Sequence, residues 1–419
     1  MQYYNYWGYA AAIVGTALLA VCLYFAVRRG VQYYKSPKPE LEAAAQESSV
    51  RVFLRSALLV LALKAVLVII TGILTGEFFG EGALIWNRWD APHYLDIAKD
   101  GYVSTGENNV FIAFFPLYPA LLSLASVLTG EYFTTGSVLS MLFFAFALFY
   151  LYKLAEREYG QKTAKRVQLL LLLYPMSYYC TIPYTEGLFL ALTAAFLYYL
   201  RGEKFIVAGV LGLFCAAQRA GGRLRLALTR SVGVMLVFPY AAAVVRKILP
   251  VKSAGEFIKK LFGRGWPIFF IPAGTLIYLF INYIVFSDPL YFLTAQREHW
   301  FIGRTLKTLM ECAINRSAEA PELFIPELVA IFGVLVLLIR YVRRKNTTIY
   351  TAYALPMFYM SVSVTWLLSA PRYMLPIYPI YFELAESFRS RRAFVMLCAV
   401  MAALSLLACI VFALGGDIY

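Results

Sequence analysis

LRSALLVLALKAVLVIITGILTGE, residues 54–77, is an almost unbroken apolar run. Only Arg55, Lys64 and Glu77 carry charge within it. A helix needs about 20 apolar residues to cross the hydrocarbon core of a bilayer. The backbone has to satisfy its own hydrogen bonds there, which a helix does within one segment. The run therefore predicts a transmembrane helix.

Runs of the same kind recur along the whole chain. Hydrophobic residues make up 61% of its 419 positions and charged residues 15%, whereas a soluble domain carries roughly 25% charged residues. The other candidate spans lie near residues 7–27, 133–153, 166–182, 184–200, 204–219, 226–246, 266–286, 323–340, 349–368, 372–388 and 393–414. The sequence therefore predicts an all-α, polytopic bundle of about 11–12 transmembrane helices.

The net charge of +14 comes from basic segments between these runs. Lys and Arg are typical of cytoplasmic loops, and basic helix ends also meet anionic lipid headgroups. We therefore expect membrane lipid, and not nucleic acid, as the partner of these charges. The segments expected in the cytoplasm are 28–55, 156–166, 201–204, 246–264, 340–345 and 389–392. Residues 78–132 and 287–322 are then large outer loops.

Two further features divide the chain. SPKPELEAAAQESSV, residues 36–50, is a soluble-looking linker. Residues 1–50 are therefore expected to form an extra N-terminal anchor and linker, and residues 51–419 the main membrane domain. In the first outer loop, Pro116 and Pro119 interrupt an apolar stretch. Because proline removes a helix hydrogen bond, this stretch is expected to form interfacial helices along the outer face and not to span.

The first outer loop also holds the strongest candidate for chemistry, Asp90 in WNRWDAPHYLDIAKDGY (86–102). Asp90 follows the span at residues 54–77, so it should lie near the membrane surface. A carboxylate there can act as general base toward an acceptor hydroxyl while a lipid-anchored donor approaches from the bilayer. The alternative is that Asp90 only caps a short interfacial helix.

Six motifs, in order along residues 51–419, carry a resemblance to a known family. They are RWDAPHYLDIAKDGY (88–102), FFPLYP (114–119), YPMSYYCTIPYTEGLF (174–189), LTRSVGV (228–234), FSDPLYFLTAQREHW (286–300) and APRYMLPIYP (370–379). Their combination resembles the GPI mannosyltransferase 2 family (the PIG-V family), including its prokaryotic members. The resemblance implies a GT-C glycosyltransferase with many transmembrane helices, a polyprenyl-phosphate mannose donor, and Asp90 as the catalytic acidic residue of the first outer loop.

The resemblance also implies substrate contacts at the other matched positions. These are Arg88, His93, Glu186, Arg230, Asp288, Gln296, His299, Trp300, Arg372 and Tyr373. Glu186 is a functional candidate because acids at the membrane interface are costly, although it could also be a helix-N-terminal carboxylate favoured by the helix dipole. Asp288 is followed by Pro289 and also fits a structural helix N-cap.

Four other matched positions suggest contacts with the donor or with lipid. Gln296 and His299 lie three residues apart and could line one helix face toward a sugar, whereas Trp300 could be an interfacial aromatic residue. Arg372 could bind the donor phosphate through two N–H groups or reach lipid headgroups.

The stretch QRAGGRLRLALTR (218–230) departs from the family, because four arginines interrupt it on the predicted outer side. Of these, only Arg230 lies in a matching motif. The signatures of other chemistries, which are the P-loop, GxGxxG, HExxH and DxD patterns, do not occur. We therefore expect neither a metal nor another cofactor, and a single displacement that inverts the anomeric carbon.

Two rival interpretations remain. A transporter or flippase of lipid-linked saccharide would spread polar groups through the middle of the membrane, and a catalytically inactive partner subunit would use the same fold as a scaffold. For the enzyme, the expected acceptor is a glycolipid or a cell-surface glycan. The expected membrane is the plasma membrane in a prokaryote or the endoplasmic reticulum in a eukaryote, with the active site on the outer or lumenal face and room for a small accessory membrane subunit.

Overall fold

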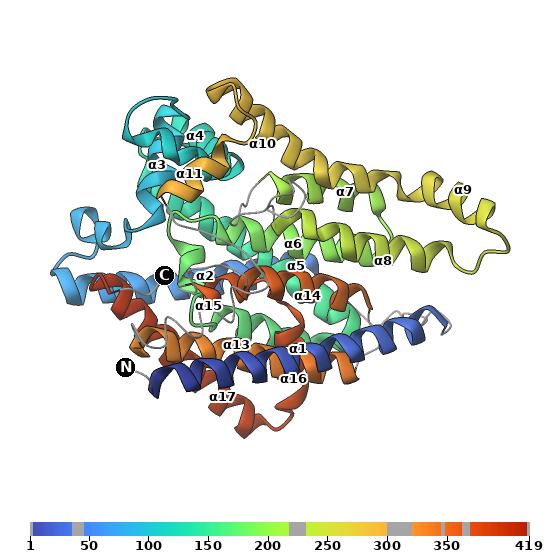
Figure 1. Cartoon of the computed structure of the whole chain (residues 1–419). Helices are drawn as coiled ribbons and strands as arrows, with labels where there is room; N and C mark the ends of the chain where they lie inside the picture. The colour runs from blue at the N-terminus through green and yellow to red at the C-terminus, as the bar shows by residue number, and fades with distance from the viewer. Residues whose placement is uncertain are drawn as a thin grey trace.

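The structure is all-α, as the sequence predicts. The computed structural model describes residues 3–35, 46–217, 232–299, 321–344, 348–362 and 369–416, and every regular element within these ranges is a helix (Figure 1). Five helical segments in the described ranges are long and apolar enough to cross a bilayer. They are Ile13–Lys35, Ser49–Thr75, Tyr132–Leu172, Ala254–Phe286 and Arg391–Ala413. The chain is therefore a multi-pass integral membrane protein.

The predicted number of about 11–12 spans stays a prediction. Several predicted spans coincide with helices of 9 to 16 residues, which are shorter than the hydrocarbon core. These helices are α6 (Glu186–Arg201), α7 (Phe205–Ala216), α8 (Val237–Ile248), α14 (Thr348–Val362) and α16 (Pro379–Ser387).

The centre of the bundle is formed by α5 (Tyr132–Leu172) and α6, which pack along each other. A Cβ at Gly187 of α6 would lie 2.7 Å from the backbone oxygen of Ser140 in α5, so the two helices approach closely there. Helix α5 is broken at Gly160, whose φ of 80° is left-handed and suits a residue without a Cβ. On the other side of α6, α7 packs against α10 (Phe270–Phe286).

The N-terminal helix α1 (Tyr3–Lys35) lies beside α13 (Pro321–Arg344) and also contacts α14 (Figure 1). It is followed by α2 (Ser49–Thr75), which packs on α5. The division into an anchor at residues 1–50 and a membrane domain at 51–419 stays a prediction. Other elements of the bundle are η5 (Val232–Leu236), α9 (Ala254–Gly265), η6 (Trp266–Phe269) and α17 (Arg391–Ala413).

The predicted first outer loop contains helices, as expected. They are η1 (Gly80–Trp86), α3 (Asp90–Asp100), η2 (Glu107–Ala113) and α4 (Leu117–Thr129). Helices α3 and α4 lie with α11 (Tyr291–His299) at the upper left of Figure 1, and η2 packs on α11, whereas η1 packs on α2. Between η2 and α4 the chain bends by 113°. This bend lies at the FFP sequence, where Pro116 cannot continue a helix from the preceding turn.

Two predicted helices differ from the structure. The span expected at residues 372–388 is two short helices, α15 (Ala370–Met374) and α16, because Pro376 and Pro379 interrupt it. The span expected at residues 166–182 ends at Leu172, just before Pro175, and η3 (Ser177–Thr181) follows. The first break leaves Tyr184 in the segment between η3 and α6, and the second leaves Arg372 in the five-residue helix α15.

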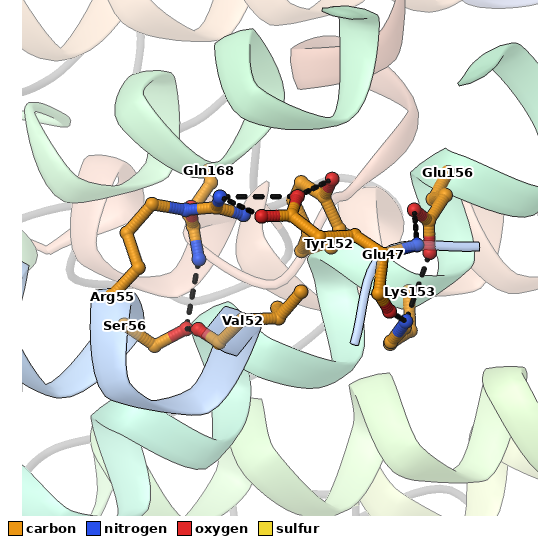
Figure 2. A network of polar contacts seen from close by, with 8 residues as sticks. All are labelled: Glu47, Val52, Arg55, Ser56, Tyr152, Lys153, Glu156 and Gln168. Atoms are coloured by element: carbon orange, nitrogen blue, oxygen red, sulfur yellow. Dashed lines mark hydrogen bonds and ion pairs between the residues drawn. The ribbon is translucent and has the colours of Figure 1, made fainter. Parts of the chain in front are cut away.

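A partly buried polar network fixes the chain just before α2 (Figure 2). The Glu47 carboxylate accepts hydrogen bonds from Arg55 at 2.9 Å and from the Tyr152 hydroxyl at 2.5 Å. The Glu47 backbone N–H donates to Glu156 at 2.7 Å, and its carbonyl accepts from Lys153 at 2.5 Å. Side chain, N–H and carbonyl are therefore all engaged, and they attach the residues before α2 to α5.

Candidate active site

The candidate active site is centred on Arg372 of α15, whose side chain is 7% exposed. Its Nη2 atom lies 3.2 Å from Asp90 Oδ2, and its Nε atom lies 3.4 Å from Glu186 Oε1. Asp90, Glu186 and Arg372 come from three of the six motifs and are far apart in sequence. The structure therefore brings three predicted site residues into one ion-paired cluster.

Three tyrosine rings surround the guanidinium group. Its central carbon lies 5.0 Å from the ring centroid of Tyr179, 5.7 Å from that of Tyr184 and 5.2 Å from that of Tyr373. Tyrosine faces attract a cation at such distances. The Tyr373 hydroxyl also accepts from Arg372 Nη2 at 3.3 Å. Arg372 is therefore held on several sides, so its position is fixed more firmly than that of a surface arginine.

Both carboxylates lie at helix N-termini. Asp90 is the first residue of α3, and Glu186 is the first residue of α6. The positive end of a helix dipole favours a carboxylate at this position. For Glu186, the helix-dipole alternative and the functional interpretation are therefore compatible. The capping alternative for Asp90 is not observed, because Trp89 occupies the N-cap position of α3 and no side-chain cap hydrogen bond forms there. Asp90 is the more accessible, because its side chain is 28% exposed and that of Glu186 only 3%.

The charges of this cluster bear on the predicted phosphate contact. One guanidinium group faces two carboxylates, and it lies 3.2 Å from one and 3.4 Å from the other. An additional phosphate at Arg372 would meet the negative charge of Asp90 and Glu186 as well. The observed contacts therefore favour Arg372 as the group that orients Asp90, and its role as a phosphate ligand stays a prediction.

The turn that carries Arg372 is fixed by residues that the sequence did not single out. Glu327 of α13 accepts a hydrogen bond from the Ala370 N–H at 3.0 Å, and Tyr174 donates one to the Pro371 carbonyl at 2.9 Å. Glu327 could have been found, because a carboxylate inside the apolar run 323–340 is unusual. Tyr174 has no such signal in a chain with 32 tyrosines.

The residue before Asp90 has an unusual backbone conformation. Trp89 has φ 59° and ψ −112°, in a region that L-residues rarely adopt. The Tyr184 hydroxyl donates to the Arg88 carbonyl at 2.7 Å and accepts from the Asp90 N–H at 3.2 Å. The Arg88 side chain turns to the Ile85 carbonyl, to which Nε donates at 3.0 Å.

His93 lies one turn along α3 from Asp90. Its ring centroid is 4.5 Å from that of Phe111 and 5.3 Å from that of Phe114. Burial lowers the pKa of His93, and the nearby Asp90 and Asp96 carboxylates oppose this shift. His93 is therefore neutral near pH 7, and its imidazole can accept or donate a hydrogen bond to a sugar hydroxyl.

The predicted site residues on α11 have different surroundings from one another. Gln296 is 4% exposed, whereas His299 is exposed, and their shared contact with a sugar stays a prediction. The exposed Asp288 accepts a hydrogen bond from the Leu290 N–H at 2.8 Å and so stabilises a turn. Helix α11 begins at Tyr291, so Asp288 lies before the N-cap position that was expected for it. Arg230 and Trp300 lie outside the described residues.

Among the residues that the structure describes, no group of three or more His, Cys, Asp and Glu side chains could hold a metal ion. The expectation that no metal is required stays a prediction.

No protein-family model matches the chain, and no curated protein matches it. A solved structure with some similarity is the crystal structure of the Archaeoglobus fulgidus oligosaccharyltransferase, tethered through a disulfide bond with an acceptor peptide that contains the NVT sequon. The two chains are 12% identical with a TM-score of 0.40, and the match covers 88% of this chain and 55% of that one. This chain thus spans about half the length of that protein. We infer neither a family nor an activity from a likeness of this extent.

Proposed function

We propose that this protein is a membrane glycosyltransferase of the GT-C type. It transfers a mannosyl or other hexosyl residue from a polyprenyl-phosphate donor to a lipid-linked or cell-surface acceptor on the non-cytoplasmic side. The observation that carries the proposal is the ion pair between Asp90 and Arg372, with the buried Glu186 on the same guanidinium group. In the family that the motifs resemble, the position of the catalytic carboxylate corresponds to Asp90.

The proposed reaction is a single in-line displacement. Asp90 accepts the proton of the acceptor hydroxyl, and the acceptor oxygen attacks the anomeric carbon of the donor. The bond between that carbon and the phosphate oxygen breaks, and the polyprenyl phosphate leaves with the electron pair. This sequence inverts the anomeric carbon and uses one carboxylate, unlike glycoside hydrolysis, which uses two carboxylates and water.

In this scheme Arg372 orients the base. A general base is effective when its geometry toward the proton is fixed, and Arg372 holds Asp90 Oδ2 at 3.2 Å from a side chain that three tyrosines enclose. His93, one turn from Asp90, is placed to contact the sugar or the acceptor. The negative charge that develops on the leaving phosphate requires a further cation, and Arg230 is the candidate from the matched motifs.

The proposed partners follow from the reaction. The donor is a polyprenyl-phosphate sugar, which reaches the site from the bilayer, and the acceptor is a glycolipid or glycan. Mannose as the sugar, the plasma membrane of a prokaryote or the endoplasmic reticulum of a eukaryote as the location, and a small accessory membrane subunit belong to the proposal as well.

The experiment that tests the proposal measures transfer of label from radiolabelled polyprenyl-phosphate mannose in membranes that contain the protein. Wild type is compared with Asp90→Asn and with Asp100→Asn as the matched control, because Asp100 is the exposed last residue of the same helix. Loss of a general base lowers the rate by about 10²–10⁴-fold, so we expect this loss for Asp90→Asn alone. Parallel reactions with EDTA test the metal-independent scheme.

Equal rates for wild type and Asp90→Asn would remove Asp90 from the mechanism. Movement of the labelled lipid across the membrane without formation of labelled product would favour the flippase alternative instead. If EDTA abolishes transfer, the glycosyltransferase proposal stands and its metal-independent form is wrong.

A further inference from the structure

The backbone at Trp89 stores strain directly beside the proposed catalytic base. A residue other than glycine in such a region of φ and ψ costs about 1–3 kcal/mol and persists only when its surroundings hold it. Trp89 has φ 59° and ψ −112° and immediately precedes Asp90, the first residue of α3. The surroundings that hold Trp89 therefore also set the direction in which the Asp90 side chain leaves the helix.

Tyr184 supplies two of these holding contacts with one hydroxyl group. It donates to the carbonyl of Arg88 at 2.7 Å and accepts from the N–H of Asp90 at 3.2 Å, so it bridges the two residues that flank Trp89. The Tyr184 side chain is fully buried. Burial raises the pKa of the hydroxyl well above its ordinary value, so it keeps the proton that it donates.

The same tyrosine also contacts the other half of the ion pair. Its ring centroid lies 5.7 Å from the guanidinium carbon of Arg372. Its own backbone is held from α5, because Ser140 donates a hydrogen bond to the Tyr184 carbonyl at 3.2 Å. Tyr184 thus links α5, the backbone before Asp90 and the cation that faces Asp90.

We propose that Tyr184 is a positioning residue for Asp90. It acts by holding Trp89 in its positive-φ conformation. The inference rests on the proposed function for its catalytic part, and on the geometry alone for its backbone part. Without the hydroxyl, Trp89 relaxes to an ordinary conformation and the carboxylate of Asp90 turns away from Arg372.

The first test compares Tyr184→Phe with Tyr240→Phe in the transfer assay. Tyr240 of α8 is also buried, and its hydroxyl donates to the Phe205 carbonyl at 3.2 Å, so it reports the loss of a buried tyrosine hydroxyl outside the hydrogen bonds that hold Tyr184. A small misplacement of a catalytic group can lower the rate by about 100-fold. We expect kcat to fall about 10- to 100-fold for Tyr184→Phe with KM for the donor unchanged, and little change for Tyr240→Phe.

The second test places Tyr184→Phe in the Trp89→Gly background. Glycine adopts positive φ at little cost, so position 89 no longer needs the hydroxyl to hold it. The fall in kcat that Tyr184→Phe causes should therefore be several-fold smaller in this background. A residue that only contributes to packing would not show this dependence on Trp89.

The free energy of unfolding gives a readout that does not require activity. It is measured for wild type, Tyr184→Phe, Trp89→Gly and the double variant. Tyr184→Phe should destabilise the wild-type background more than the Trp89→Gly background. Equal effects in both backgrounds, in kcat and in stability, would overturn the proposal, and so would a Tyr184→Phe protein with wild-type kcat. If wild type transfers no sugar, the proposed function fails, and the stability cycle still decides whether Tyr184 holds Trp89.

Discussion

Replacing Arg372 by methionine should show how strongly the cluster of Asp90, Glu186 and Arg372 depends on the positive charge of Arg372. Methionine keeps a long apolar side chain among the three tyrosine rings but removes the charge. The two ion pairs lie at 3.2 and 3.4 Å, and at an effective dielectric constant of about 20 each corresponds to about 5 kcal/mol of attraction before desolvation is subtracted. Removing one partner of a buried pair costs about 3–5 kcal/mol, because the other charge stays buried alone.

The two carboxylates should respond differently to this change. Glu186 is 3% exposed and cannot regain water, whereas Asp90 is 28% exposed and can. Adding Glu186→Gln to Arg372→Met should therefore recover a large part of the lost stability. Adding Asp90→Asn should recover less. The expected coupling of Arg372 with Glu186 is on the order of 1–3 kcal/mol, and its coupling with Asp90 is smaller.

The assay is reversible unfolding in mixed micelles of increasing SDS fraction, followed by tryptophan fluorescence. Single and double variants give the two coupling free energies from one set of curves. Additive effects of Arg372→Met and Glu186→Gln would refute the buried ion pair as a source of stability. A larger coupling with Asp90 than with Glu186 would refute the assignment of the cost by exposure.

Two further predictions concern packing and pH. Gly187→Ala places a Cβ 2.7 Å from the Ser140 carbonyl oxygen, which belongs to the backbone and cannot move aside. The substitution should therefore lower the free energy of unfolding by about 1–3 kcal/mol in the same micelle assay. The control is Gly263→Ala, where a Cβ meets open space and no such clash arises. Burial lowers the pKa of His93 in the folded protein below its ordinary value of about 6.5. Between this lowered pKa and about pH 6.5 the unfolded chain binds more protons than the folded protein, so the free energy of unfolding should rise with pH across this window. Unfolding curves at several pH values should show that His93→Phe flattens this rise, and an unchanged slope in the variant would contradict it.

The sequence predicts the class of fold because membrane helices follow from apolar length alone. It misplaces two spans, at residues 166–182 and 372–388, where prolines lie inside apolar runs. Counting apolar residues does not register that a proline removes a hydrogen bond. The first break leads to Tyr184 and Glu186, and the second lies just after the short helix that carries Arg372, so both adjoin the candidate site.

The site itself was only partly predictable. Asp90, Glu186 and Arg372 stood out individually, because charged groups near a membrane are costly. Their meeting at one point depends on packing between segments up to 282 residues apart, which local patterns do not encode. Tyr184 lies in the motif at residues 174–189, but nothing in the sequence distinguished it from the other tyrosines of that motif. Its importance comes from the backbone conformation of Trp89, which only the structure reveals.

The pinning of Glu47 has a consequence for how the N-terminal part of the chain can vary. Its N–H, carbonyl and carboxylate are all bound to side chains of α2 and α5 (Figure 2). These bonds should keep α2 in place on α5 when residues before Glu47 are substituted. Glu47 thus sets where α2 starts along α5, whereas an exchange of α1 for another helix would also have to replace its packing on α13 and α14.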